Sequence, residues 1–367
     1  MLTPLSLSPT ITQRHIPNLN GLNVHILEAG NPNHPLILLL HGFPELAYSW
    51  RRIIPGLAEA GFHVAAPDLR GFGRTTGWDP AYDASLEPFT LLNLVRDTLA
   101  LTAALGHDHV AVLAGHDAGS SVAAICALVR PDIFRSLVLM SAPFAGPQCF
   151  PPAPQKPFDM PAELAALAPP RQHYQWYYTA RTANAEMLGP PQGLHAFLRA
   201  YYHHKSADWP GNVPHPLPGQ TAGAMATLPT YYVMHADRTM PDSVEMPTPS
   251  QVAANLWLPD SELAVYAAEY ARTGFQGGLN WYRGRIAGLH ARDLATFAGR
   301  RIEVPARFIA GRQDWGTHQF PGAFETMMDH SFAKSRGAHF IEGAGHWVQQ
   351  ERPAESLALL LQAARDR

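Results

Sequence analysis

The chain has 367 residues, of which 46% are hydrophobic and 16% are charged, and this composition predicts a globular protein with a large buried core. A formal net charge of −3 provides no basic surface for nucleic acid or an anionic membrane, so we expect neither as a partner. The two cysteines, Cys126 and Cys149, lie in no CxxC pair and beside no histidine, which argues against a metal site or a disulfide scaffold. The first 15 residues lack the features of a secretory signal, and no apolar run is long enough to span a membrane, so we expect a cytoplasmic protein.

Short apolar segments alternate with helical ones over the first 145 residues. Strands are expected at residues 22–30, 35–42, 62–71, 109–115 and 136–143. Helices are expected at residues 47–61, 89–106 and 118–130. The run PLILLLHG at 35–42 is apolar up to its last two residues, as is typical of a parallel strand that is buried on both faces. The alternation predicts an α/β fold with a mostly parallel central sheet and helices on both of its faces.

The character of the sequence changes after Pro143. Ten of the 12 tyrosines lie between Tyr174 and Tyr282, and strand alternation is weak in this part of the chain. The proline-rich run 203–232 predicts a long irregular excursion. Strands and helices alternate again from residue 304 onward. We therefore predict a core built from residues 1–145 and 296–367, with a helical cap domain inserted over residues 146–295.

The stretch VLAGHDAGSS at 112–121 has the pattern of a strand, a tight turn and a helix. Asp117 stands between Gly115 and Gly119, at the position that a nucleophile occupies in a strained strand-to-helix elbow. Ser120 and Ser121 follow one turn into the helix, where we expect their side chains to point away from such a site. The alternative is an ordinary turn in which Asp117 only caps the helix.

Further polar residues follow other predicted strands. His41 ends the strand before the elbow strand, and the next N–H, that of Phe43, is a candidate oxyanion donor together with the N–H of Ala118. Asp314 and His346 each come just after a later strand, in the chain order nucleophile, acid, histidine. Simple turns at His41 and at Asp314 are the alternatives. We expect Asp117, Asp314 and His346 to form a catalytic set.

An aspartate nucleophile favours a particular kind of chemistry. A carboxylate is ionised at neutral pH, since its ordinary pKa is about 3.9, and it needs no base to attack. Attack on an sp³ carbon gives an alkyl ester, which water can then hydrolyse. His346, oriented by Asp314, would activate that water. A serine esterase or lipase is excluded because the elbow holds no serine.

Five motifs carry a resemblance to a known family: HGFPE, GHDAGSS, TGFQGGLNWYR, GRQD and GAGHW. Together they resemble the epoxide hydrolases of the α/β-hydrolase fold, and the likeness extends from about residue 15 to 365. The resemblance implies that two cap tyrosines, Tyr174 and Tyr282, bind and protonate the epoxide oxygen, and that the product is a vicinal diol. For Tyr177, Tyr178, Tyr201 and Tyr202 we favour packing within the cap.

The same resemblance implies a small apolar epoxide and water as the molecules bound, without a cofactor or a metal. We expect His41, Trp281, Trp347 and Tyr178 to contribute to substrate binding. A monomer and a homodimer are both compatible with the sequence. One departure stands out, because the residue after the nucleophile is commonly tryptophan in these enzymes and is Ala118 here.

Two alternative functions remain open from the sequence. A haloalkane or haloacetate dehalogenase of the same fold shares the aspartate nucleophile, but it needs a tryptophan and an asparagine, or arginines, near the elbow. This chain has Ala118 and Phe43 at the tryptophan and asparagine positions, and Ser120 and Ser121 where the arginines would lie. The other alternative is a non-catalytic protein of this fold that binds a small molecule. The presence of Asp117, Asp314 and His346 together argues against it.

Overall fold

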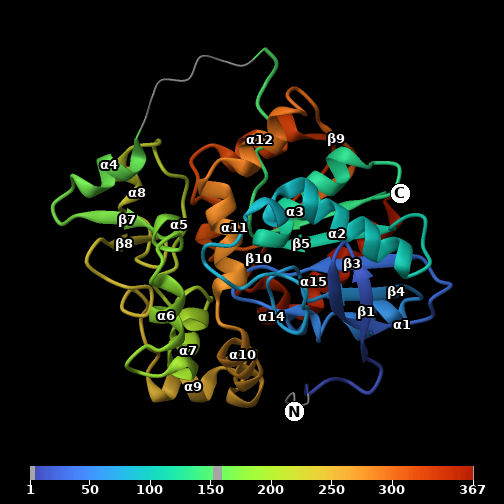
Figure 1. Ribbon diagram of the computed structural model, residues 1–367, viewed down its shortest axis with the longest axis horizontal. Helices are drawn as coiled ribbons and strands as arrows, with labels where there is room; N and C mark the ends of the chain where they lie inside the picture. Colours follow the sequence, from blue (N-terminus) through green and yellow to red (C-terminus); the bar gives the residue numbers. More distant parts are fainter. Residues whose placement is uncertain (1–4, 152–158, 367) are drawn as a thin grey trace.

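An eight-stranded sheet lies at the centre of the computed structural model, which describes residues 5–151 and 159–366 (Figure 1). The strands are β1 (Thr12–Leu19), β2 (Leu22–Ala29), β3 (Leu36–Leu40), β4 (His63–Pro67), β5 (Val112–His116), β6 (Leu137–Met140), β9 (Ile302–Gly311) and β10 (Phe332–Ile341). Their order is β1-β2-β4-β3-β5-β6-β9-β10, and only β1 with β2 and β2 with β4 pair antiparallel. The expected α/β fold with a mostly parallel sheet is confirmed.

Strand β1 was not expected from the sequence. Six of its eight residues, TQRHIPNL, are exposed, and only Ile16 and Leu19 are buried. The strand forms the edge of the sheet and pairs with β2 on one side alone. An edge strand with so little buried surface has no clear apolar alternation in its sequence.

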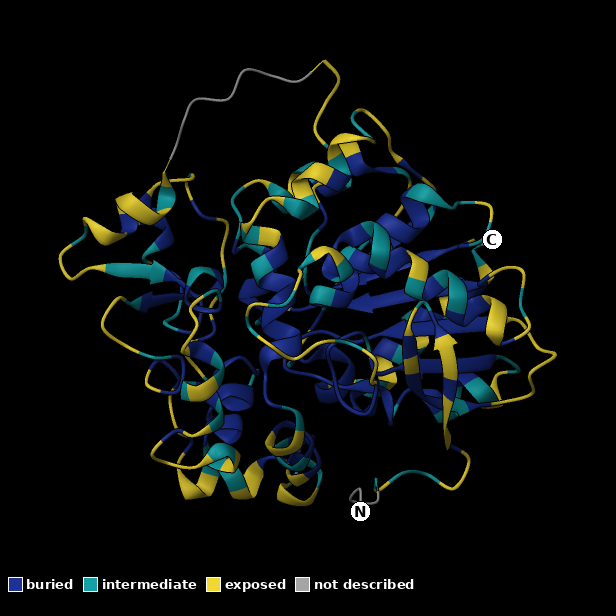
Figure 2. Ribbon diagram, in the orientation of Figure 1, coloured by how far each residue is buried: buried dark blue, intermediate teal, exposed yellow. Residues whose placement is uncertain are grey.

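Helices cover both faces of the sheet. The core helices are α1 (Ile54–Glu59), α2 (Leu91–Ala104), α3 (Ala118–Val129), α13 (Ala323–Thr326), α14 (Val348–Glu351) and α15 (Pro353–Arg365). All five residues of β3 are buried; Leu38 and Leu40 pack into the hydrophobic cluster that contains α2 and α3, whereas Ile37 and Leu39 pack into the cluster that contains α1 and α15. In Figure 2 the strands at the centre of the sheet are buried, whereas the helices in front of them expose part of their outer faces.

The helix expected at 47–61 is interrupted. A 3₁₀ turn, η1, covers Ala47–Trp50, and α1 begins only at Ile54, with Pro55 in its first turn. Proline lacks the N–H that would continue a helix from the preceding turn, so a new helix begins with Pro55 in its first turn instead of running through it. Three further short turns are η2 (Glu87–Phe89), η3 (Trp315–Thr317) and the π-helical η4 (Met327–Ser331).

The chain between β6 and β9, called here the inserted region, is mainly helical. Its helices are α4 (Met160–Ala165), α5 (Tyr174–Tyr177), α6 (Ala183–Leu188), α7 (Leu194–His204), α8 (Ala222–Met225), α9 (Pro249–Ala254), α10 (Asp260–Thr273), α11 (Gln276–Ile286) and α12 (Leu289–Ala295). Two short strands, β7 (Arg171–His173) and β8 (Val233–His235), form a small antiparallel sheet that was not expected. Most of the excursion 203–232 is irregular, apart from the end of α7 and the short α8. In Figure 1 helices α4 to α10 lie beside the sheet, and α11 passes between them and the core.

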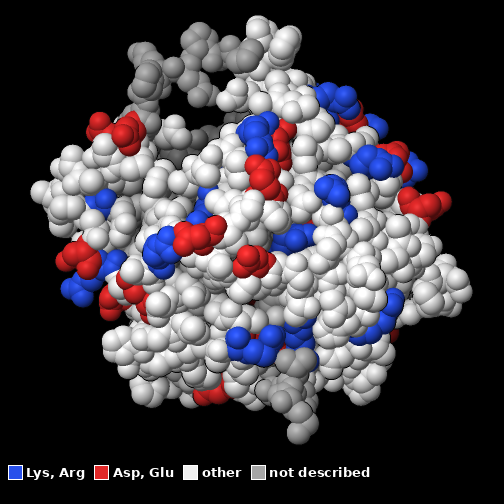
Figure 3. Space-filling model, viewed as in Figure 1, with Lys and Arg blue, Asp and Glu red and all other residues white. Residues whose placement is uncertain are grey.

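The surface carries both signs of charge. Figure 3 shows Lys and Arg side chains next to Asp and Glu side chains over the face in view, without a broad patch of one sign. Within residues 5–151 and 159–366 no helix is both long and apolar enough to cross a membrane.

Candidate active site

Asp117 lies in a strained turn between β5 and α3. Its backbone angles are φ 50° and ψ −118°, in a region that side-chain-bearing residues rarely adopt. The flanking glycines leave no room for any other residue, because a Cβ atom on Gly115 would lie 2.3 Å from the carbonyl oxygen of Gly119, and one on Gly119 would lie 2.5 Å from that of His41. The Asp117 side chain makes no capping hydrogen bond to α3, so the alternative of a simple helix cap is wrong.

The carboxylate of Asp117 lies between the loop after β3 and the histidine loop. Its Oδ1 accepts the N–H of Phe43 at 3.0 Å, and its Oδ2 lies 3.5 Å from Nε2 of His346. The other ring nitrogen of His346, Nδ1, lies 3.1 Å from Oδ1 of Asp314, which also accepts the N–H of Gly316 at 2.7 Å. The fold therefore brings the three residues together, with the His346 ring between the carboxylates of Asp117 and Asp314.

Both aspartates are held in the ionised form. Burial favours the neutral acid, but the hydrogen bond and charge of His346, together with the charges of Lys205 and His116, hold the pKa of Asp117 well below its usual range. The pKa of Asp314 is lowered as well, because His346 and the Gly316 N–H outweigh its burial. Asp117 can therefore act as a nucleophile at neutral pH without a base.

A cavity opens from Asp117 toward the inserted region. It encloses about 630 Å³, counted with the open solvent at its mouth. It is lined by Leu91, Asp117, Ala118, Ser121, Ala142, Pro143, Tyr174, Gln175, Trp281, Tyr282, Arg285, His290, Gln319 and Phe320. The nucleophile and the two tyrosines expected from the sequence thus border the same space.

Tyr174 and Tyr282 come from different helices, α5 and α11, and their ring centroids lie 5.7 Å apart. The hydroxyl of Tyr174 accepts from the Gln175 amide at 3.1 Å and donates to the Gln319 side chain at 3.4 Å. Burial and the negative charge of Asp117 raise the pKa of both phenols above the ordinary value of 10. Both hydroxyls therefore keep their protons and can donate hydrogen bonds.

The expected substrate-binding residues divide into two groups. Trp281 lines the cavity, but His41, Trp347 and Tyr178 lie behind its wall, contrary to the expectation from the sequence. Their polar atoms have protein partners: the Trp347 indole donates to the carbonyl of Tyr202 at 2.8 Å, and the Tyr178 hydroxyl lies 3.1 Å from that of Tyr201.

His41 shapes the loop that carries Phe43. Its Nε2 accepts the N–H of Leu69 at 3.1 Å, which leaves Nδ1 to donate to the carbonyl of Gly42 at 2.8 Å. Burial lowers the pKa of His41, so the ring is neutral. A neutral ring with both nitrogens engaged orients this loop and does not reach the cavity.

The two serines after the elbow behave differently from each other. Ser120 is buried, and its hydroxyl donates to the carbonyl oxygens of Gly115 and Met140, as expected for a structural residue. Ser121 lines the cavity, so the expectation that it points away is wrong. Positions three apart share a helix face, and Ser121 therefore lies beside Ala118.

Four further polar cavity residues were not identified from the sequence: Gln175, Gln319, Arg285 and His290. Local signals existed for two of them, because Gln175 follows Tyr174 directly and Arg285 lies three residues after Tyr282 on α11. Gln319 lies in the loop after Asp314, and its distance from Tyr174 depends on how the inserted region packs on the core.

A buried acid lies beneath the histidine loop. Glu45, the last residue of HGFPE, lies 2.5 Å from Nδ1 of His116, and Nε2 of His116 donates to the carbonyl oxygen of His346 at 2.7 Å. Burial lowers the pKa of His116, but the charge of Glu45 outweighs it and the pKa is raised overall. This ion pair lies next to His346 on the side away from the cavity.

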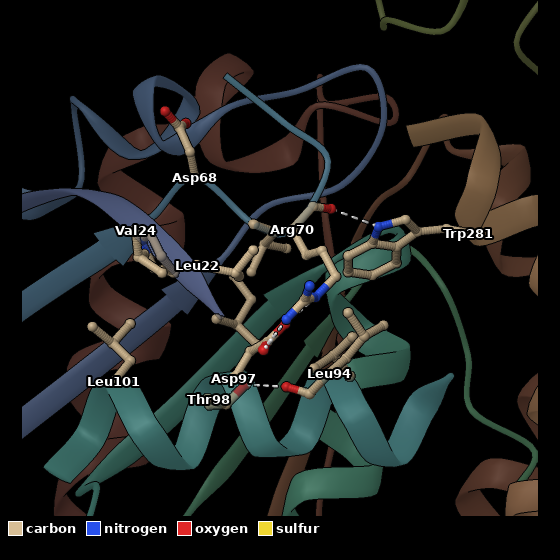
Figure 4. A pocket seen from close by; sticks show the side chains of 13 residues that line it. Leu22, Val24, Asp68, Arg70, Leu94, Asp97, Thr98, Leu101 and Trp281 are labelled. Atoms are coloured by element: carbon tan, nitrogen blue, oxygen red, sulfur yellow. Dashed lines mark hydrogen bonds and ion pairs between the residues drawn. The ribbon is translucent and has the colours of Figure 1, made fainter. Parts of the chain in front are cut away.

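A second cavity lies on the other side of Trp281 (Figure 4). It is mostly apolar, with Leu22, Val24 and Leu94 in its wall, and the ion pair of Arg70 with Asp97 closes one side. The Trp281 indole donates to the carbonyl oxygen of Arg70 at 2.9 Å. Trp281 borders both cavities and is the partition between them.

The chain is similar to known proteins over most of its length. A family model described as the alpha/beta hydrolase fold matches residues 35–205. Epoxide hydrolase A of Mycobacterium tuberculosis is 34% identical over 357 residues, which cover 94% of each chain. The structure of an epoxide hydrolase from an endophytic Streptomyces superposes with a TM-score of 0.78 at 30% identity and covers 98% of this chain and 96% of that one. Potato epoxide hydrolase I gives a TM-score of 0.76 at 29% identity, over 97% of this chain and 100% of that one.

Proposed function

Because the chain belongs to the epoxide hydrolases of the α/β-hydrolase fold, we propose that it converts a small apolar epoxide to a vicinal diol through a covalent ester on Asp117. The observation that carries this mechanism is the position of the Asp117 carboxylate. It lies between the Phe43 N–H and His346, and it faces a cavity that Tyr174 and Tyr282 also line.

In the first step Asp117 attacks a ring carbon of the epoxide. Its Oδ1 is engaged by the Phe43 N–H, so Oδ2 is the oxygen that forms the new C–O bond. The ring C–O bond breaks; Tyr174 and Tyr282 both hydrogen-bond the departing oxygen, and one of them donates its proton and becomes a tyrosinate. The product of this step is a hydroxyalkyl ester of Asp117, with Oδ1 as its carbonyl oxygen.

In the second step water attacks the ester carbonyl carbon. His346 takes the proton from water, and the carboxylate of Asp314 stabilises the resulting imidazolium. The N–H of Phe43 and the N–H of Ala118 at the start of α3 stabilise the oxyanion on Oδ1, and one such donor is worth about 10²–10³ in rate. When the intermediate collapses, the departing diol oxygen takes the proton from the His346 imidazolium. The carboxylic acid left on Asp117 loses its proton, one proton returns to the tyrosinate formed in the first step, and the free enzyme is regenerated.

These proposed roles also divide the chain into a core and a cap domain. We take residues 1–145 and 296–367 as the core that supplies the nucleophile, acid and base, and residues 146–295 as a cap domain that supplies the two tyrosines.

The test is mass spectrometry of a His346→Gln variant incubated with a panel of epoxides. The ester should form but not hydrolyse, so the peptide that contains Asp117 should gain the mass of one epoxide. A His34→Gln variant, altered at an exposed histidine, is the control and should turn over normally. Diol formation by His346→Gln at the wild-type rate, with no adduct, would overturn the mechanism.

Oxygen labelling tests the same proposal independently. In a single turnover in H₂¹⁸O the first diol should carry no ¹⁸O, because one of its oxygens comes from the epoxide and the other from Oδ2 of Asp117. One ¹⁸O atom in that first diol would mean that water attacks the epoxide directly.

A further inference from the structure

Lys205 has an unusual environment for a lysine. It follows the last residue of α7 and is only 3% exposed. Its Nζ lies 4.9 to 5.8 Å from the ring centroids of four aromatic residues, Tyr201, Tyr231, Tyr232 and Trp347. Among residues 5–151 and 159–366 no carboxylate lies within ion-pair distance of this ammonium. The aromatic faces stabilise the cation without neutralising its charge.

The backbone of Lys205 is attached to the loop of the proposed base. Its carbonyl oxygen accepts the N–H of His346 at 2.9 Å. A Cβ atom on Gly345 would lie 2.7 Å from that oxygen and 2.5 Å from the carbonyl carbon of Ser206, so the two segments touch along their backbones. The caged ammonium is therefore held at a defined place beside the acid–histidine pair.

The positive charge of Lys205 and the carboxylates of the active site affect one another. The pKa of Lys205 is lowered, because burial outweighs the opposite effect of the carboxylates of Asp117, Asp314 and Glu45. The same ammonium contributes to the low pKa of Asp117 and to that of Asp314. The cage and the backbone contacts place the ammonium close to the acid–histidine pair, where a positive charge favours the ionised form of both carboxylates.

A general base must be neutral before it can accept a proton from water. His346 lies between two carboxylates, Asp117 and Asp314, and both favour the imidazolium form. Once Asp117 is an ester it carries no charge, and the negative charge of Asp314 then faces the positive charge of Lys205. In the hydrolytic step these two charges therefore act on the His346 ring in opposite senses.

Building on the proposed function, we propose that Lys205 is a positioning residue for the hydrolytic step, whose caged ammonium keeps His346 neutral while the ester on Asp117 awaits water.

The other titratable groups around His346 and Lys205 do not replace this charge. His116 is paired with Glu45, burial lowers the pKa of His204 to about 3, and burial raises the pKa of each tyrosine of the cage. Glu351 of α14 accepts the N–H groups of Ala207, Gly345 and Trp347.

The experiment separates the two half-reactions in single turnovers that are quenched and analysed by mass spectrometry across a range of pH. In Lys205→Met the pH midpoint of ester hydrolysis should move upward by about one unit, which means roughly a tenfold slower hydrolysis below the midpoint. Alkylation of Asp117 should change much less. Lys205→Arg, which restores a positive charge, should move the midpoint back toward the wild-type value. Lys334→Met, altered at an exposed lysine of β10, is the matched control and should show the wild-type midpoint.

A hydrolysis rate that falls equally at every pH, or an unchanged midpoint, would overturn the proposal and leave Lys205 with a packing role. Thermal melts of each variant identify any that do not fold. If Lys205→Met is one of these, Lys205→Gln removes the same charge with a polar side chain and should give the same midpoint shift. Absence of any ester on Asp117 in the wild-type enzyme would refute the proposed function itself, which is a different result from an ester that forms and hydrolyses with an unaltered midpoint.

Discussion

Asp117 and Ala118 lie at the turn between β5 and α3, where Asp117 contributes its side chain and Ala118 its backbone N–H. The strained backbone of Asp117 presents its carboxylate to the cavity, while Ala118 offers an N–H at the start of α3 and a small side chain at the cavity wall. A methyl group at this position leaves space beside the nucleophile, which Ser121 one turn later shares.

This space leads to a prediction about substrate size. Ala118→Trp should lower kcat/KM for a bulky aryl epoxide at least tenfold, because the indole would fill the cavity next to Asp117, while a small alkyl epoxide should be affected little. Ala118→Ser, which adds one atom, is the control. Steady-state kinetics gives kcat/KM for the bulky and for the small epoxide. If the ratio of these two values is the same in Ala118→Trp as in the wild type, the space beside Asp117 is not free.

The tyrosines differ in how they are engaged. Tyr174 and Tyr282 line the cavity, whereas the Tyr178 hydroxyl is bound to Tyr201 behind it. Tyr174→Phe and Tyr282→Phe should each slow alkylation of Asp117 by about 10², since each removes a donor to the departing oxygen. Tyr178→Phe should leave alkylation within a few-fold of wild type. Rapid-quench measurement of how fast the ester forms on Asp117 tests these expectations. A large effect of Tyr178→Phe on that rate would contradict the placement of Tyr178 behind the cavity.

At the scale of elements, α11 reaches the core through a backbone contact. A Cβ atom on Gly277 would lie 1.9 Å from the carbonyl oxygen of Gly71, and one on Gly71 would lie 2.7 Å from the carbonyl carbon of Gly277. The two glycines allow the first turn of α11 to press against the loop after β4. This close approach positions Tyr282 on the same helix.

Gly277→Ala should therefore displace α11, slow alkylation of Asp117, and lower the free energy of unfolding by about 1–3 kcal/mol. Gly223→Ala is a matched control, because Gly223 also lies in a helix but a Cβ atom there would meet nothing within 4 Å. Denaturant unfolding and rapid-quench kinetics test both effects. If Gly277→Ala and Gly223→Ala have the same stability and the same alkylation rate, the contact with Gly71 can adjust to an added methyl group.

Asp68 connects three segments of the chain. It accepts hydrogen bonds from the His25 side chain of β2, from the N–H of Ala47 in η1 and from the N–H of Arg74 in the loop after β4. Burial opposes its ionisation, but these donors and the charge of His25 lower its pKa to about 2. A carboxyl whose pKa is lowered on folding stabilises the protein above its unfolded pKa of about 3.9, and this contribution is lost as the pH falls toward 2.

The comparison with Asp68→Asn isolates that contribution. At pH 7 the variant should be less stable by roughly 2 kcal/mol, and the difference should shrink as the pH falls from about 4 to 2. Urea unfolding of both proteins across this range measures the difference. A stability difference that does not change with pH would mean that Asp68 acts through geometry alone.

At the scale of the whole molecule, core and inserted region share many buried contacts. Arg51 pairs with Glu262 of α10, the Ser49 hydroxyl lies 2.8 Å from that of Tyr266, and the Tyr202 hydroxyl donates to the carbonyl oxygen of Pro44 at 2.9 Å. The apolar cluster that contains α2 and α3 also includes residues of α7, α10 and α11. Removing the inserted region would expose this surface to water.

We therefore expect a single cooperative unfolding transition, with the same midpoint by far-UV circular dichroism and by tryptophan fluorescence. Calorimetry should show one peak whose calorimetric and van't Hoff enthalpies agree. Two resolved transitions would mean that the inserted region unfolds independently of the core.

Much of the core and of the proposed catalytic set could be predicted from the sequence because both are specified by local patterns. Buried parallel strands are apolar throughout, and their carboxyl ends meet at one edge of the sheet, so residues placed just after them converge. Asp117, Asp314 and His346 are such residues. Strand β1 was missed because an exposed edge strand buries too few residues to leave a pattern.

What only the tertiary structure decided is which side chains of the core and of the inserted region reach the site. Its irregular segments have no period that would reveal the path of the chain, so the sequence could not indicate that Gln319 meets Tyr174, or that Trp347 and Tyr178 lie behind the cavity wall. The cage around Lys205 is the clearest example. Its rings come from α7, from the segment before β8 and from the residue after His346, and only long-range packing brings them around one ammonium.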